Sequence, residues 1–300
     1  MQEREGFADM LVSHALQLNT RCLQVLVDAQ RGVDVAAADW RAVLSDLARL
    51  ESVWLMVRSG VSDDAYRAAR DRLRCAQRTL RPHGDWAGQV FDDLAAKVTD
   101  ERKLRALKRV AQEIDGSPGP GEQDLVGLGE MLRAESAGWR DTDQLRGLSP
   151  EALSHGVLRA YRKARKACHK YAAELASSKR LERAARWVGY LANQLELLAP
   201  GLSDAKDEPL TAVVRLHDVL AHQVALQRLS RLVDEAGNAK RHRRVRGMLA
   251  ARCRPLHRRS EKLIGLGLEA SADTFRRRID DAVGTMGVGE ISLAPIESDR

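Results

Sequence analysis

The sequence has 300 residues, a mass of 33.3 kDa and a formal net charge of +7. Hydrophobic residues make up 44% and charged residues 30%, a balance that argues against global disorder. Only 4% of the residues are aromatic, and Leu, Ala and Arg, which favour helices, are abundant, so an all-β fold is disfavoured. The sequence has no run of about 18 apolar residues, so no membrane span is predicted. The N-terminus MQEREGFADM is unlike a secretory signal. We therefore expect a cytoplasmic protein.

Helical periodicity runs through most of the chain, with apolar residues recurring at spacings of three, four and seven. No useful run of alternating polar and apolar residues predicts a strand. The expected helices are 7–31, 40–57, 63–80, 85–114 (one or two helices), 124–137, 150–176, 178–198, 208–236, 239–267 and 272–283. The fold class is therefore predicted to be all-α.

A run of Gly, Ser and Pro over 116–121 is the strongest break in this pattern. We predict an N-terminal helical bundle over 1–115, a linker with a short helix over 116–148, a basic C-terminal bundle over 149–283 and a loose tail over 284–300. The halves differ in charge, because residues 1–150 carry a net of −3 and residues 151–300 a net of +10. This polarity favours a polyanionic partner for the C-terminal half.

Motifs for catalysis or cofactor binding are not found in the sequence. It contains no phosphate loop of the GxxxxGK type, no GxSxG and no HExxH. The four cysteines Cys22, Cys75, Cys168 and Cys253 lie far apart and lack the spacing of zinc ligands, so they are expected to pack as small apolar residues. His217 and His222 share a helix but not a face, so a shared metal is not expected. We expect a protein that is not an enzyme and needs no metal or cofactor.

The segment 159–170 carries the most concentrated positive charge. On a helix, a continuous strip at spacings of three and four is formed by Arg159, Arg162, Lys163, Lys166, His169 and Lys170. Such a strip repels itself unless an anion binds, and Arg and Lys both bind phosphoryl oxygens. The alternative is a solvated face that only aids solubility. A second basic region, 240–259, faces several directions and is more typical of a solvated or packing helix.

At these residues the chain resembles the CHAD domain, the conserved-histidine α-helical domain that binds inorganic polyphosphate. The similarity covers about residues 7–283. Its blocks are 39–58, 61–67, 70–74, Trp139, 148–152, 161–166, 193–200 and 216–229. The resemblance implies two pseudo-symmetric four-helix bundles around a central basic groove, and no catalytic activity of the domain itself.

The sequence departs from the CHAD pattern HxxRxxxxRxR, which usually opens each half. The corresponding positions are Arg41, Leu44, Ser45, Arg49 and Glu51 in the first half and Glu182, Ala185, Arg186 and Gly189 in the second, with Val224 and Ala225 replacing a later acidic pair. The chain therefore resembles a divergent member, in which the strip 162–170 is best preserved.

These observations predict a protein that binds inorganic polyphosphate, with a possible association with polyphosphate granules, through Lys and Arg on inward-facing helices. The predicted binding residues are Arg162, Lys163, Arg165, Lys166, Lys170, Arg183, Arg186, Arg41, Arg49 and Arg74. Two alternatives remain open. One is a nucleic-acid-binding protein, although no aromatic platform or helix-turn-helix pattern is visible. The other is a protein–protein scaffold that has lost the anion site.

Overall fold

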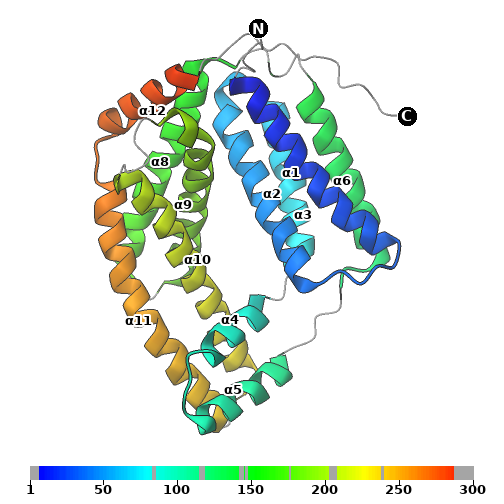
Figure 1. Ribbon diagram of the computed structural model, residues 1–300, viewed down its shortest axis with the longest axis vertical. Coiled ribbons are helices and arrows are strands. Elements are labelled where there is room, and N and C mark those ends of the chain that lie inside the picture. The colour runs from blue at the N-terminus through cyan, green and yellow to red at the C-terminus, as the bar shows by residue number, and fades with distance from the viewer. Residues whose placement is uncertain are drawn as a thin grey trace.

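The computed structural model describes residues 7–82, 86–114, 119–141, 145, 148–175, 177–202, 208–237 and 240–286. Every regular element in these ranges is a helix, which confirms the all-α fold class (Figure 1). None of the described helices is long and apolar enough to cross a membrane. The predicted loose tail, beyond the end of the last helix at Met286, lies outside the described residues.

The helix ranges predicted from periodicity agree with the structure to within a few residues, and the range 85–114 forms two helices. The helices are α1 (Phe7–Gln30), α2 (Ala37–Val57), α3 (Asp63–Leu80), α4 (Trp86–Ala95), α5 (Glu101–Ile114), α6 (Glu122–Arg140), α8 (Pro150–Ala172), α9 (Ser178–Leu198), α10 (Glu208–Glu235), α11 (Lys240–Leu268) and α12 (Ala272–Met286), with 3-10 turns at Arg58–Gly60 and Ala199–Gly201. Serine caps fix several of the starts, because the Ser62 and Ser149 hydroxyls accept hydrogen bonds from the amides of Ala65 and Ala152.

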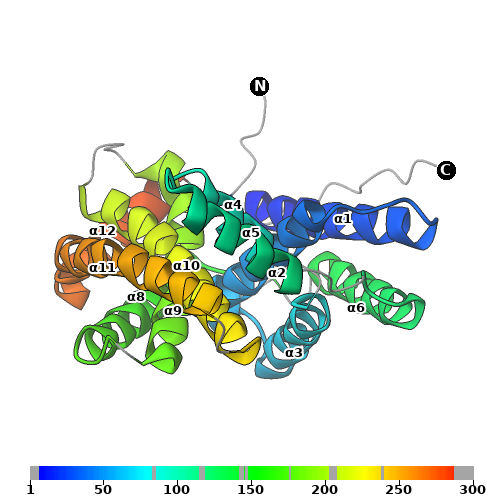
Figure 2. The same ribbon diagram turned by 90° about the horizontal axis from the view of Figure 1, so that it is seen from below.

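The long helices pack as two groups (Figures 1 and 2). In the first group α1 contacts α2 and α6, and α3 contacts the same two helices. In the second, α8 contacts α9 and α11, α10 contacts the same two helices, and α12 lies against α8. Each group therefore closes on itself, and each helix buries its apolar stripe inside its group.

The two groups share one hydrophobic core, because α2 packs directly against α8 and α9. The approach is closest at Gly156 of α8, where a Cβ atom would lie 2.0 Å from the carbonyl oxygen of Met56. Two buried hydrogen bonds join α2 to α9: the Ser52 hydroxyl donates to the carbonyl of Tyr190, and the Gln194 amide donates to the carbonyl of Ser52, both over 2.9 Å. These contacts hold the groups in a fixed relation.

The hairpin α4–α5 packs against α10 and α11, away from α1 and α2 (Figure 1). It has a hydrophobic cluster of its own, in which Phe91, Leu94 and Val110 meet Leu229 and Val245. Helix α6, which the sequence analysis assigned to the linker 116–148, is 19 residues long and packs on α1 and α3. The contacts therefore cross the boundaries expected at 115 and 148, because a break in periodicity shows where a helix ends but not which helix it packs on.

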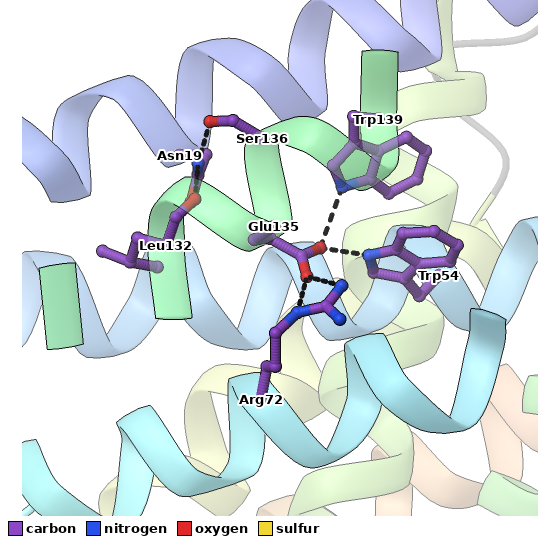
Figure 3. A network of polar contacts seen from close by, with 7 residues as sticks. All are labelled: Asn19, Trp54, Arg72, Leu132, Glu135, Ser136 and Trp139. Atoms are coloured by element: carbon purple, nitrogen blue, oxygen red, sulfur yellow. Dashed lines mark hydrogen bonds and ion pairs between the residues drawn. The ribbon is translucent and has the colours of Figure 1, made fainter. Parts of the chain in front are cut away.

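A buried carboxylate fixes α6 against α2 and α3 (Figure 3). Glu135 is fully buried, and its Oε1 accepts hydrogen bonds from the indole nitrogens of Trp54 and Trp139, the latter over 3.0 Å. Its Oε2 accepts from Nη2 and Nε of Arg72 at 3.0 and 3.3 Å. One turn away, the Asn19 amide donates to the carbonyl of Leu132 and ties α1 to the same helix. The network satisfies a charge that would otherwise be costly to bury.

Candidate anion-binding site

The basic strip predicted over 159–170 lies on the solvent-exposed face of α8. We call the side chains Arg159, Arg162, Lys163, Lys166 and Lys170 the α8 stripe; all five residues are exposed. The opposite face of the helix is apolar and buried, with Ala160, Tyr161, Ala164, Ala167 and Cys168. The amphipathic pattern fixes this orientation, since the helix turns its apolar side towards α9, α11 and α12.

No acidic residue interrupts the α8 stripe. Helix α8 carries no Asp or Glu after Glu151. In the part of the chain that the structure describes, none of the five stripe side chains forms an ion pair. At a rise of about 1.5 Å per residue the stripe is about 17 Å long. Five cations over this length repel each other, so a bound anion would lower the electrostatic energy.

A cleft separates α2 and α3 from α9 and α10. Its volume is about 440 Å³. Its basic lining residues are Arg81, Arg186, Arg228 and His217, and its acidic lining residues are Glu51 and Glu182. Small or apolar side chains supply much of the remaining wall, including Ala48, Ala185, Gly189, Ala221 and Val224. The cleft is therefore a mixed surface rather than a uniformly basic groove.

Arginines compensate both acids of the cleft. Glu51 is buried and accepts a hydrogen bond from Nε of Arg74 over 2.8 Å. Glu182 lies 3.6 Å from the guanidinium of Arg231. Arg81, Arg186 and Arg228 consequently leave the cleft with a positive excess.

Burial shifts the titration of several groups in the cleft. It lowers the pKa of Arg228, and the neighbouring charge of Arg81 lowers it further. Burial likewise lowers the pKa of His217, whose buried Nδ1 has no hydrogen-bond partner in the structure. The buried Nε2 of Gln77 also lacks a partner. The cleft thus holds two buried polar nitrogens, on His217 and Gln77, whose bonding capacity is incompletely used.

The structure does not bring the ten predicted residues together in one groove. Among them, only Arg186 lines the cleft. Arg74 does not line the cleft but forms an ion pair with Glu51, which does. Arg41 and Arg49 are half-buried on α2, and the guanidinium of Arg49 lies 3.9 Å from the carboxylate of Asp46. The five residues Arg162, Lys163, Arg165, Lys166 and Lys170 do not line the cleft. The expectation that they face inward is therefore corrected, because the apolar face of α8 occupies the interior.

Helix α9 carries basic side chains from the cleft towards α8. Arg183 lies three residues before Arg186 and Lys179 four residues before Arg183, and both are exposed, so they extend the line of charge along α9. Between the two helices, the Arg180 guanidinium donates to the carbonyl of Lys170 over 3.0 Å and pairs with Glu174 at 2.7 Å. Arg180 thus belongs to the helix packing, whereas Arg183 and Lys179 present their charge to solvent.

Arg81, Arg228 and Gln77 of the cleft were not identified from the sequence, and His217 was assigned an ordinary surface or core role. Polar and apolar residues are mixed around α10, so its periodicity does not mark the face that lines the cleft. His217 and Arg228 are partly buried, but the sequence alone does not separate them from Arg215 and Arg231, which are exposed on the same helix.

In the second basic region three side chains support packing, whereas Arg243, Arg244, Arg254, Arg258 and Arg259 are exposed, as the sequence predicted for a helix with charge on several sides. Arg241 pairs with Glu113 of α5, and His242 Nε2 lies 2.9 Å from the same carboxylate. Arg246 pairs with Asp234 over 3.1 Å. Within the described residues, no group of three or more His, Cys, Asp or Glu side chains could hold a metal ion.

Comparison with known proteins leaves this chain without a match. No family model matches the sequence, and no curated protein or solved structure is significantly similar to it. The resemblance to CHAD domains therefore stays a prediction.

Proposed function

We propose that this chain is a non-catalytic protein that binds inorganic polyphosphate, with the α8 stripe as its main contact surface. The observation that carries the proposal is the acid-free, exposed face of α8, on which five Lys and Arg side chains have no ion-pair partner in the described structure. A face that serves only solubility needs no such separation of charge, since mixed surface charges serve equally well.

A linear polyanion suits the α8 stripe better than a compact anion. Its cations are spread over about 17 Å of helix, too far apart to converge on one phosphate. A phosphate chain can meet them in succession and release the counterions that they would otherwise hold, as nucleic acids do. Arg183 and Lys179 of α9 give the chain a continuation towards Arg186 and the cleft.

The arrangement of the CHAD-like positions supports the same proposal. Of the eleven positions that correspond to the family pattern, nine line the cleft between α2, α3, α9 and α10: Leu44, Ser45, Glu51, Glu182, Ala185, Arg186, Gly189, Val224 and Ala225. In each group four helices also pack in a ring, each against two others of the four, which is compatible with the two four-helix bundles that the resemblance implies. In this proposal the replacements have weakened the central groove, and the outer face of α8 provides most of the binding. Association with polyphosphate granules would follow from the same contacts.

Titration with polyphosphate of defined length at two salt concentrations tests the proposal. We expect Lys163→Glu/Lys166→Glu to weaken binding by at least about tenfold at low salt, because two attractive charges become repulsive. The matched control is Arg102→Glu/Arg105→Glu, which makes the same change in net charge on exposed residues of α5. Equal binding by the α8 variant and the wild type would refute the site. Equal loss in both variants would show only a response to net charge.

Competition with duplex DNA tests the alternative that the protein binds nucleic acid. If DNA displaces long-chain polyphosphate at an equal concentration of phosphate, the protein is a nucleic-acid-binding protein or a general polyanion binder. If both ligands fail to bind at low salt, the remaining alternative is a protein–protein scaffold.

A further inference from the structure

A second cavity lies between the α4–α5 connection and the middle of α11. Its volume is about 320 Å³, at the lower end of the range of roughly 300–1,000 Å³ found for small-molecule pockets. Leu94, Val98, Met248 and Pro255 give it an apolar wall. It lies apart from the α8 stripe and shares no lining residue with the central cleft.

Cations surround this apolar wall. Lys97, Lys103 and Arg252 line the cavity, and none of the three forms an ion pair within the described residues. The one acid in the lining, Asp100, is engaged in capping α5, because its Oδ1 accepts hydrogen bonds from the amides of Arg102 and Lys103 at 2.8 and 3.3 Å. The cavity therefore combines an apolar surface with a net positive rim.

A proline of α11 forms part of the cavity wall. Pro255 has no N–H to donate to the carbonyl of Ala251, four residues earlier in the helix. Ala251 and Pro255 both line the cavity, so its α11 wall lies where the regular hydrogen bonding of the helix is interrupted.

The walls of the cavity belong to two parts of the molecule that are joined by their own small core. One wall is the hairpin α4–α5 and the other is α11, and the hydrophobic cluster between them is separate from the main core. A molecule seated between the two walls contacts both of them. Its binding would therefore stabilise the docking of the hairpin by mass action.

We infer that this cavity binds a small amphipathic anion, namely an apolar or aromatic body with a single carboxylate, sulfonate or phosphate group, and that the bound molecule fastens the α4–α5 hairpin to α11. The apolar wall of Leu94, Val98 and Met248 would receive the body, and Arg252, Lys97 and Lys103 would receive the anionic group. Neither the α8 stripe nor polyphosphate takes part, so the inference is independent of the proposed function.

Fluorescence titration with anilinonaphthalene sulfonate tests this site, with N-phenylnaphthylamine as the matched probe that lacks the sulfonate. We expect one saturable sulfonate site per chain and weaker binding of the neutral probe. Arg252→Gln should lower the affinity for the sulfonate probe roughly tenfold, which is the usual effect of losing one hydrogen bond to a charged group. The affinity for the neutral probe should stay nearly unchanged. Met248→Trp, which fills the cavity, should abolish the binding of both probes.

The control for position is Arg254→Gln, an exposed residue on another side of α11, which should bind both probes as the wild type does. Circular dichroism of each variant checks that it is folded, because a molten variant binds the sulfonate probe through exposed apolar surface and an unfolded chain binds little of it. Hydrogen exchange supplies a second measurement: the amides of α4 and α5 should exchange more slowly when the sulfonate probe is bound. Unchanged titration curves for both Arg252→Gln and Met248→Trp would overturn the inference, as would unaltered exchange in the hairpin at saturation.

Discussion

At the scale of single residues, Glu135 shows how this fold accommodates a buried charge. Its two carboxylate oxygens accept four hydrogen bonds from Trp54, Trp139 and Arg72, which come from three different helices. Removing one member of such a network leaves the others without partners in a place that water does not reach. The residue therefore contributes to the correct packing of α2, α3 and α6 as well as to their stability.

Glu135→Gln is expected to lower the free energy of unfolding by about 3 kcal/mol, because Arg72 loses its counter-charge and one acceptor becomes a donor that faces other donors. Urea denaturation measures the change. The control, Glu130→Gln on the exposed side of the same helix, should stay within about 0.5 kcal/mol of the wild type. A loss of equal size in both variants would contradict the role assigned to the network.

The α8 stripe shows how far the position of single side chains can be predicted from the sequence. The sequence contains both the spacing of the stripe and the apolar residues Tyr161, Ala164 and Cys168 on the other side of the helix. Together the two stripes determine that the cations face solvent, yet the resemblance to a domain with a central groove suggested that they face inward. The cleft residues Arg81 and Arg228 come together only through the packing of α3 and α10, a relation that local periodicity does not contain.

At the scale of helices, the contact between α2 and α8 depends on the lack of a side chain at Gly156. Gly156→Ala should lower the free energy of unfolding by about 1–3 kcal/mol, because its Cβ would overlap the backbone of Met56. By contrast, Gly127→Ala on α6, where no atom lies within 4 Å of the new Cβ, should raise it by about 0.5–1 kcal/mol through helix propensity. Thermal and urea unfolding of both variants measure the contrast. If both substitutions stabilise the protein, the helices are not as close as described.

The docking of the hairpin α4–α5 should depend on pH through Glu113. The hydrogen bond to His242, followed by the charge of Arg241, lowers the pKa of Glu113 below its ordinary value of 4.5. A lowered carboxyl pKa stabilises the docked hairpin above the ordinary value, and the contribution disappears as the pH falls through the folded value. Hydrogen exchange of α5, corrected for intrinsic rates, should therefore show weaker protection below pH 4.5 than at neutral pH.

Glu113→Gln provides the control for this pH dependence. The variant should show reduced protection of α5 at neutral pH and little further change on acidification, while α1 behaves as in the wild type. An acid response of α5 that persists unchanged in the variant would assign the effect to other carboxylates.

The position of this hairpin also explains where prediction from the sequence ended. Periodicity predicted one or two helices over 85–114, but it could not tell whether Phe91 and Val110 pack on α2 or on α10. The glycine and proline run after α5 suggested a domain boundary, whereas the contacts of α6 return the chain to α1. Helix existence depends on local sequence, while the choice of partner depends on the shape of the whole assembly.

At the scale of the whole molecule, positive charge is concentrated in the C-terminal half of the chain. The C-terminal half carries a net of +10, and part of this excess is used within the protein, since Arg241 and Arg246 pair with Glu113 and Asp234. Exposed positive charge remains on α8, where no acid follows Glu151, on α9, and also on α11, at Arg243, Arg244, Arg254, Arg258 and Arg259. A long-range field of this kind steers a polyanion to one side of the molecule and weakens with salt.

The salt dependence of polyphosphate binding shows whether the polyanion contacts α8. The logarithm of the binding constant should fall linearly with the logarithm of the salt concentration, and Lys163→Gln/Lys166→Gln should make the slope shallower by about two counterions, one for each contact removed. The same neutralisation on α5, Arg102→Gln/Arg105→Gln, should leave the slope nearly unchanged. A slope that is the same in the wild type and the α8 variant would show that the polyanion does not contact this helix.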